Sequence, residues 1–125
     1  MDQAEPARAQ TERAQIGHAE HAIAARALAR LRAAHVDVLD DATAELRIRT
    51  LALASDFSID ICLRQPALLP RLLHDDGASP PPLPALTAEH RADWPTLLRR
   101  YRQAESVRLI WRDVRGLDTL DQTLA

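Results

Sequence analysis

Three arginines near the carboxyl end of the chain have a spacing that could hold an anion. Arg108, Arg112 and Arg115 stand at i, i+4 and i+7, which places them on one face of a helix. Guanidinium groups bind phosphates and carboxylates through forked hydrogen bonds. This row therefore predicts a contact with a nucleotide phosphate or with an acidic surface of a partner.

The same charges have a second, internal interpretation. Residues 91–115 contain seven arginines and three acids, whereas residues 37–60 contain six acids and two arginines. Opposite charges on neighbouring helices complement one another. This interpretation predicts that the basic helix packs beside the acidic helices and needs no external ligand.

The other candidates for chemistry have simpler structural interpretations. His18 and His21 share a helix face but lack a third ligand at metal-binding spacing. Cys62 stands among isoleucine and leucine residues without a nearby histidine, which predicts a core thiol. Asp75 and Asp76 lie at a helix end, where acids more often support a turn than bind Mg²⁺. We therefore predict no catalytic, cofactor-binding or metal-ligating residue in this chain.

A long C-terminal helix must position the arginine row. Apolar residues recur at three-and-four spacing through residues 94–114, and Gly116 has the place of a helix-ending glycine. Asp118 can cap a further helix that starts at Thr119.

The preceding residues predict further helical segments. Residues 9–34 form a helix whose thin apolar stripe is Ile16, Ala19, Ile23, Ala27, Leu31 and Ala34. Asp40 or Asp41 caps the next helix. Its predicted inner side consists of Leu46, Thr50, Leu53 and Ala54.

A serine and two prolines organise the middle of the chain. Ser55 is the expected N-cap of a helix that runs to Gln65, with Asp56 in its first turn. The side chains expected to pack inward are Phe57, Ile61 and either Cys62 or Leu63. Pro66 ends this helix, and a short 3₁₀ turn should precede a new start at Pro70.

These segments predict an all-α fold of five or six helices. We divide it into a helical N-terminal extension (1–39), a central helical region (40–74), a proline-rich surface loop (75–90) and an arginine-rich helix with the start of another (91–125). The loop contains Pro80, Pro81, Pro82 and Pro84, which favour an extended conformation.

Composition limits the classes of function. The chain has 125 residues, 46% of them hydrophobic and 27% charged, with a formal net charge of −2. This composition is typical of a folded domain and does not favour nucleic-acid binding. No apolar run has the roughly 20 residues that a membrane span needs. A single cysteine without a partner in the chain favours a reducing, cytoplasmic compartment.

Two stretches resemble the bifunctional glutamine synthetase adenylyltransferase/adenylyl-removing enzymes. RRYRQAESVRLIWRDVRGL and LDTLDQTL are similar to an arginine-rich helix and the following leucine-rich helix in the N-terminal region of that family. The more specific block is Trp111-Arg112-Asp113 with Gly116 and Leu117. Ser55-Asp56-Phe57 resembles a second signature of the family. The resemblance covers residues 42–125, while residues 1–39 are similar only as a helical extension.

The resemblance implies the helical N-terminal region of an adenylyl-removing domain, which a nucleotidyltransferase domain follows. Such enzymes transfer AMP from ATP to glutamine synthetase and remove it by phosphorolysis, in response to PII signalling protein and glutamine. Mg²⁺ and ATP serve the full-length enzyme, and none of its catalytic residues falls on this chain. We therefore expect residues 1–125 alone to be inactive. The alternative is a stand-alone helical interaction module that docks PII protein or glutamine synthetase, and the sequence leaves open whether Ala125 is a natural end.

Overall fold

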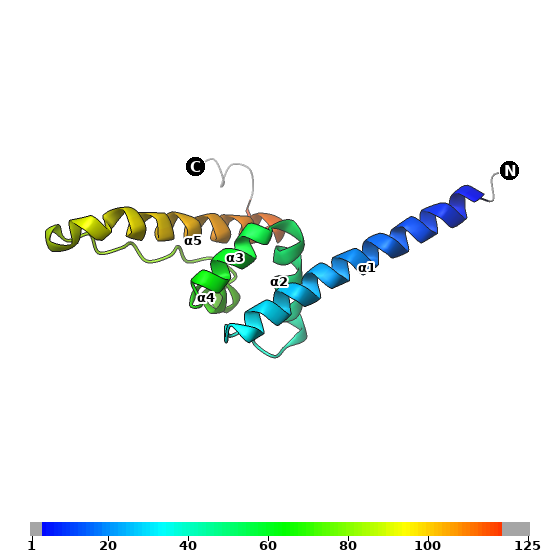
Figure 1. The fold of residues 1–125 in the computed structure, drawn as a ribbon, viewed down its shortest axis with the longest axis horizontal. Coiled ribbons are helices and arrows are strands. Elements are labelled where there is room, and N and C mark those ends of the chain that lie inside the picture. Colours follow the sequence, from blue (N-terminus) through cyan, green and yellow to red (C-terminus); the bar gives the residue numbers. More distant parts are fainter. Residues whose placement is uncertain (1–3, 119–125) are drawn as a thin grey trace.

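The computed structural model describes residues 4–118, and this part of the chain is all-α (Figure 1). Its elements are α1 (Ala4–Ala33), α2 (Ala42–Ala54), α3 (Asp56–Arg64), α4 (Leu68–Asp75), the 3₁₀ helix η1 (Ala88–Asp93) and α5 (Trp94–Val114). The predicted fold class is confirmed. Within the described residues, no helix is both long enough and apolar enough to cross a bilayer.

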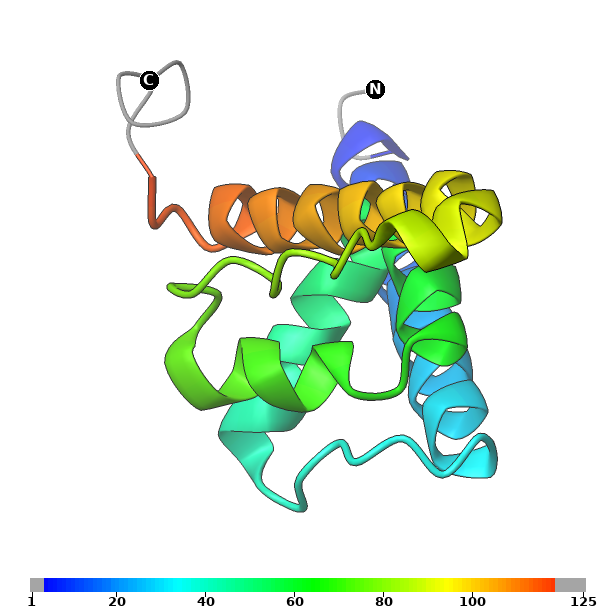
Figure 2. The same cartoon turned by 90° about the vertical axis from the view of Figure 1, so that its left-hand side faces the viewer.

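The core lies where the carboxyl half of α1 meets α2, α3, α4 and α5 (Figures 1 and 2). α5 lies across the shorter helices, and the extended segment after α4 runs beside it. The largest fully buried side chains are Trp111, Leu31, Ile48, Leu51, Ile59, Ile61, Leu69 and Val107. Each of the five α-helices thus contributes at least one apolar side chain to a single cluster, which holds α5 in place above the turn that follows α4.

Polar caps start α2 and α3 as the sequence predicts. The Asp41 carboxylate accepts a hydrogen bond from the Ala44 amide at 2.7 Å. Ser55 separates the two helices because its backbone is extended, with φ of −156°. Its hydroxyl oxygen accepts from the Ser58 amide at 3.1 Å. Both side chains satisfy amides that have no partner within the helix.

Gly116 ends α5 with a complete set of terminal hydrogen bonds. Its φ of 65° is in the left-handed region that favours glycine. The Gly116 amide donates to the Asp113 carbonyl at 3.0 Å, and the Leu117 amide donates to the Arg112 carbonyl at 2.9 Å. This pair of bonds is a Schellman motif. The predicted helix end is therefore confirmed, while the expected helix from Thr119 lies outside the described residues.

The predicted inner side of α2 is wrong. Leu46 is 63% exposed and Leu53 is 39% exposed. The buried residues of this helix are Ala44, Ile48, Leu51 and Ala52. α2 carries two apolar stripes, and it turns toward α1, α3 and α5 the one whose members stand at i, i+4, i+7 and i+8. The contacts with α1, α3 and α5 therefore determine which of the two stripes is buried.

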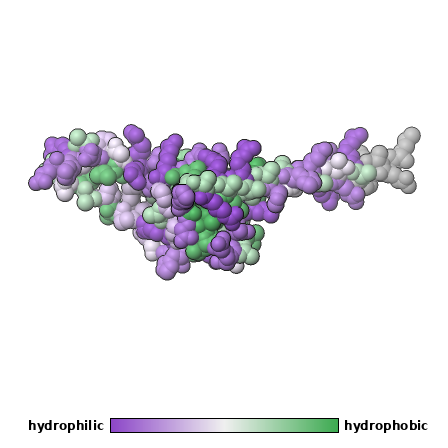
Figure 3. Space-filling model, turned by 60° about the horizontal axis from the view of Figure 1, so that its bottom comes forward, coloured by the Kyte–Doolittle hydropathy of each residue, from purple (hydrophilic) through white to green (hydrophobic). Residues whose placement is uncertain are grey.

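Two other core predictions hold only in part. Ala27 and Leu31 of the α1 stripe are buried, but Ile16 and Ile23 are 59% and 50% exposed. The amino half of α1 extends beyond the other helices, so nothing in the described structure covers that part of the stripe (Figure 1). This arm has a mostly hydrophilic surface, whereas apolar side chains gather over the central body (Figure 3). Phe57 of α3, predicted to point inward, is 47% exposed.

Pro70 lies inside a helix instead of starting one. α4 begins at Leu68, two residues earlier than predicted, and the Leu68 amide donates to the Gln65 carbonyl at 3.0 Å. Pro70 is the third residue of α4, so its missing amide would have bonded to the Pro66 carbonyl, which lies outside the helix. The first turn therefore tolerates the ring.

Candidate functional site: the arginine row and the turn after α4

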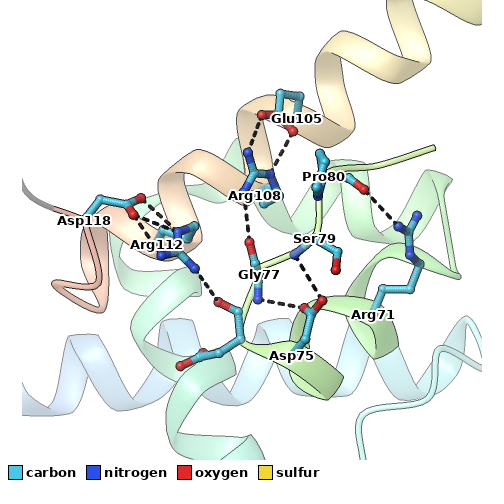
Figure 4. Close-up of polar contacts among 10 residues, drawn as sticks. Arg71, Asp75, Gly77, Ser79, Pro80, Glu105, Arg108, Arg112 and Asp118 are labelled. Atoms are coloured by element: carbon cyan, nitrogen blue, oxygen red, sulfur yellow. Dashed lines mark hydrogen bonds and ion pairs between the residues drawn. The ribbon is translucent and has the colours of Figure 1, made fainter. Parts of the chain in front are cut away.

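Arg108 and Arg112 of the arginine row face the turn that connects α4 to the proline-rich segment (Figure 4), and Arg115 donates a hydrogen bond to Asp76 of the same turn. This turn consists of Asp75, Asp76 and Gly77, and it packs against the carboxyl half of α5. Asp76 and Gly77 both have positive φ, 57° and 75°. A Cβ atom on Gly77 would lie 3.2 Å from Cδ1 of Trp111, so only glycine allows this close approach without adjustment.

Arg108 joins two acceptors. Its guanidinium donates to both carboxylate oxygens of Glu105, at 2.6 and 2.9 Å, and to the Gly77 carbonyl at 3.0 Å. The hydrogen bonds to Glu105 are the largest influence on the pKa of Arg108, and they raise it. Arg108 therefore connects α5 to the turn through the Gly77 carbonyl, while Glu105 of the same helix balances its charge.

Arg112 binds the segment that follows α5. Its Nε lies 2.9 Å from both carboxylate oxygens of Asp118, and its Nη2 lies 2.8 Å from Oδ1 of that residue. Its Nη1 donates weakly to the Asp76 carbonyl at 3.4 Å. The predicted capping acid, Asp118, is thus the ion-pair partner of Arg112.

Asp76 is the centre of a charge cluster, the Asp76 cluster, which joins the turn after α4 to Arg108, Trp111, Arg112 and Arg115. Arg115 approaches its carboxylate with Nε at 2.6 Å from Oδ1 and Nη2 at 2.8 Å from Oδ2. The indole Nε1 of Trp111 donates to Oδ1 at 2.8 Å. Trp111 is fully buried, so this bond satisfies its only polar atom. The Nη2 hydrogen bond and the close ion-pair contact of Nε, whose N–H lacks hydrogen-bond geometry, join the indole donor in fixing the turn on α5.

The pKa of the Asp76 carboxyl lies below its ordinary value of 3.8. Burial is the largest single influence and acts to raise this pKa. Hydrogen bonds from Arg115 and Trp111 act in the other direction, as do the charges of Arg115 and Arg47. Together these interactions outweigh burial and keep the carboxylate ionised.

Asp75 supports the turn itself. Oδ1 accepts from the Gly77 amide at 3.1 Å and Oδ2 accepts from the Ser79 amide at 3.0 Å. Hydrogen bonding by the Ser79 side chain is the largest cause of a lowered Asp75 pKa, and backbone amides contribute further. The predicted role of these acids in supporting a turn is confirmed by these contacts.

These carboxylates do not fit Mg²⁺. Both oxygens of Asp75 accept backbone amides, and both oxygens of Asp76 face Arg115. An ion would have to displace these donors, and the arginine would repel it. Among residues 4–118, no group of three potential ligands is close enough to hold a metal.

The other sequence-predicted residues lie away from this cluster. His18 and His21 are exposed on α1. Cys62 is fully buried, and burial raises the pKa of its thiol to about 12, so its assignment as a core thiol is confirmed. The predicted contact of Arg108, Arg112 and Arg115 with an external anion stays a prediction, since the acceptors found here are internal.

The basic helix α5 packs beside α2 and α3, as predicted, but the predicted charge pairing between them is not found among residues 4–118. Arg30 of α1 donates to Asp60 at 2.8 Å, and Arg32 of α1 binds Glu45 at the same distance. The acids of α2 and α3 therefore face α1, while the arginines of α5 use Asp76, Glu105 and Asp118. Asp76 had no sequence signal as a partner, because 39 residues separate it from Arg115.

The fold and the charge cluster define an all-α helical unit in which the clustered charges hold elements together. Among known proteins, this chain is similar to a segment of the bifunctional glutamine synthetase adenylyltransferase/adenylyl-removing enzymes, as its motifs indicate. No protein-family model and no solved structure matches it.

Three relatives illustrate the extent of this similarity. The chain is 54% identical over 79 residues to the enzyme of Xanthomonas oryzae pv. oryzae, with 63% of the chain aligned. It is 49% identical over 100 residues to that of Stenotrophomonas maltophilia K279a and 48% identical over 107 residues to that of Xanthomonas campestris pv. campestris ATCC 33913. The aligned segment spans 8–11% of the length of these relatives.

Proposed function

We propose that this chain is part of an enzyme that adenylylates and deadenylylates glutamine synthetase and thereby regulates nitrogen assimilation. The observation that supports this is the identity of about one half with the bifunctional enzymes, over as much as 83% of the chain. The relatives are much longer than the aligned segment. The proposal therefore assigns ATP, Mg²⁺ and the contacts with glutamine synthetase and PII protein to the longer enzyme, in the cytoplasm.

Within that enzyme, this segment has a structural and not a catalytic role. Nucleotidyl transfer requires carboxylates that hold Mg²⁺ beside the phosphates. The acids of the described cluster are instead bound to arginine, indole and amide donors. Residues 1–125 should therefore neither add nor remove AMP on their own.

Mass spectrometry of glutamine synthetase tests the non-catalytic role of this chain. The purified chain, incubated with Mg²⁺ and ATP or with phosphate, should leave the mass of modified and unmodified glutamine synthetase unchanged. A gain or loss of AMP with this chain alone would contradict the non-catalytic role.

A transplant tests the enzymatic context. Replacing the aligned segment of the Stenotrophomonas maltophilia enzyme with this chain should retain both activities, because the identity of 49% covers 100 residues of it. An unrelated helical segment of equal length is the control and should abolish them. A soluble, folded hybrid that has lost both activities would count against the proposal.

A second candidate function is a stand-alone helical module that docks PII protein or glutamine synthetase. It is favoured by the groove that the exposed Phe57 lines together with Pro95 and Leu98, because apolar grooves at the surface often mark interaction sites. The two candidates differ in one measurement. A stand-alone module should bind one of these proteins without the rest of the enzyme, in a pull-down with the purified chain.

A further inference from the structure

A mixed apolar and basic groove lies between α3 and α5, on surface that the arginine row does not use. Its lining includes Phe57 from α3 and Pro95, Leu98, Arg99 and Arg102 from α5, and its volume is about 390 Å³. Phe57 is the only phenylalanine of the chain and remains 47% exposed. Its ring offers apolar area whose removal from water would stabilise a complex.

The arginines of this groove differ from those of the row. Arg99 and Arg102 stand at i and i+3 on α5, and both are exposed. Neither has a carboxylate within ion-pair distance in residues 4–118, whereas Arg108, Arg112 and Arg115 are each paired. No acid lines the groove. Its charge is therefore positive and unbalanced within the described part of the chain.

The composition of the groove specifies the chemistry of its ligand. Aromatic and arginine side chains are enriched among residues that dominate protein–protein binding. A groove between two helices suits the apolar stripe of a third helix, which presents side chains at i, i+3 or i+4 and i+7. Glutamates or aspartates beside that stripe would form charge-assisted hydrogen bonds with the two arginines.

We propose that the groove between α3 and α5 binds an acidic amphipathic helix of a partner protein. The partner helix inserts an apolar side chain against Phe57 and Leu98 and places carboxylates beside Arg99 and Arg102. The site is independent of the Asp76 cluster, so binding should not require the ion pairs that hold the turn after α4. It also does not depend on the enzymatic role of the chain, because it rests only on this surface.

A displayed library of helical peptides of about 16 residues, roughly four turns, tests the proposal. Selection on the complete 125-residue chain should enrich peptides with acids beside apolar residues at helical spacing. An enriched peptide, synthesised with a fluorophore, is then titrated by fluorescence anisotropy. A selection that yields no enriched peptide, or peptides without acidic residues, would overturn the proposal.

Two groove variants and a charge-matched control complete the test. Phe57→Ser and the double variant R99E/R102E should each weaken binding at least about tenfold. The control R8E/R13E makes the same change in net charge on the exposed arm of α1 and should change affinity less than about twofold. Circular dichroism verifies that the variants keep the native helix content.

Alternative outcomes of the titration are equally decisive. Equal loss of affinity in the control would show general attraction of an acidic peptide to a basic chain and would refute a specific groove. Retained affinity in the Phe57→Ser variant would show that Phe57 is not the apolar anchor and would overturn the proposed binding mode. The proposal that the ligand is a protein helix would also be overturned if a single-stranded RNA bound more tightly than the peptide and if this RNA binding were lost in R99E/R102E.

Discussion

Replacing Asp76 with alanine is expected to lower the free energy of unfolding by about 3 kcal/mol. The variant removes the carboxylate that Arg115 and the Trp111 indole share, with contacts between 2.6 and 2.8 Å. It also puts alanine at φ of 57°, where a side chain without a polar group is disfavoured. The turn after α4 would then lose its strongest attachment to α5.

The magnitude follows from burial. The side chains of Arg115 and Asp76 are 25% and 26% exposed, which lies between a surface pair worth about 0–1 kcal/mol and a buried pair whose disruption costs about 3–5 kcal/mol. We therefore assign about 1.5 kcal/mol to their coupling. An indole N–H left without an acceptor in the core costs about 1–3 kcal/mol. Asp76→Asn retains an acceptor and tolerates positive φ, so its cost should be about half as large.

Urea denaturation followed by far-ultraviolet circular dichroism measures these values. A double-mutant cycle with D76A and R115A isolates the coupling between the two side chains. Arg102→Ala, which removes an exposed arginine without an ion pair among residues 4–118, is the control and should change stability by less than about 0.5 kcal/mol. A coupling energy below about 0.3 kcal/mol would refute the conclusion that Asp76 holds the turn on α5.

Acid should lower the free energy of unfolding through protonation of the Asp76 carboxylate. Since the pKa of Asp76 is lower in the folded chain than its ordinary 3.8, its contribution is fully present above that pH and disappears as pH falls through the folded-state pKa. Urea midpoints between pH 6 and 2 should therefore fall less steeply in D76N, and parallel curves would contradict this. Ser55→Ala should lower the free energy of unfolding by about 1–2 kcal/mol, because the amide and the buried hydroxyl of Ser58 both donate to the Ser55 oxygen. Ser55→Asp restores an acceptor for the amide and should recover part of this loss in the same urea titration. Gly77→Ala should destabilise by about 1–3 kcal/mol through its φ of 75° and the 3.2 Å approach to the core indole. Gly17→Ala, on an open helix position, should instead raise the helical dichroism signal, and equal effects of the two glycine variants would refute this distinction.

Most predictions that depended on a few neighbouring residues were confirmed. Asp41 and Ser55 cap helices because the side-chain oxygen and the amide it accepts are three residues apart. Gly116 ends α5 because its backbone conformation is restricted locally. The prediction that Pro70 starts a helix was wrong because the exact start of α4 was not known. Pro70 lies in the first turn of α4, where the backbone lacks the hydrogen bond that proline would break.

Predictions that depended on distant neighbours were less successful. α2 has two apolar stripes, and only its contacts with α1, α3 and α5 determine that Ile48 is buried while Leu46 is exposed. Phe57 is apolar like its buried neighbours in α3, yet α5 leaves it beside an open groove. Hydrophobic periodicity identifies a helix but does not identify which neighbour covers each face.

The sequence by itself determined the all-α class, most of the helix boundaries, the core position of Cys62 and the resemblance to the adenylyltransferase enzymes. Each of these depends on local hydrogen bonding, periodicity or motif order, which the linear chain contains. Only the tertiary structure decided that Arg115 binds Asp76 while Arg99 and Arg102 lack an ion-pair partner among residues 4–118. The physical reason is that all arginines have the same charge and donors, so their roles depend on which acceptors the packing of distant helices brings within a few ångströms.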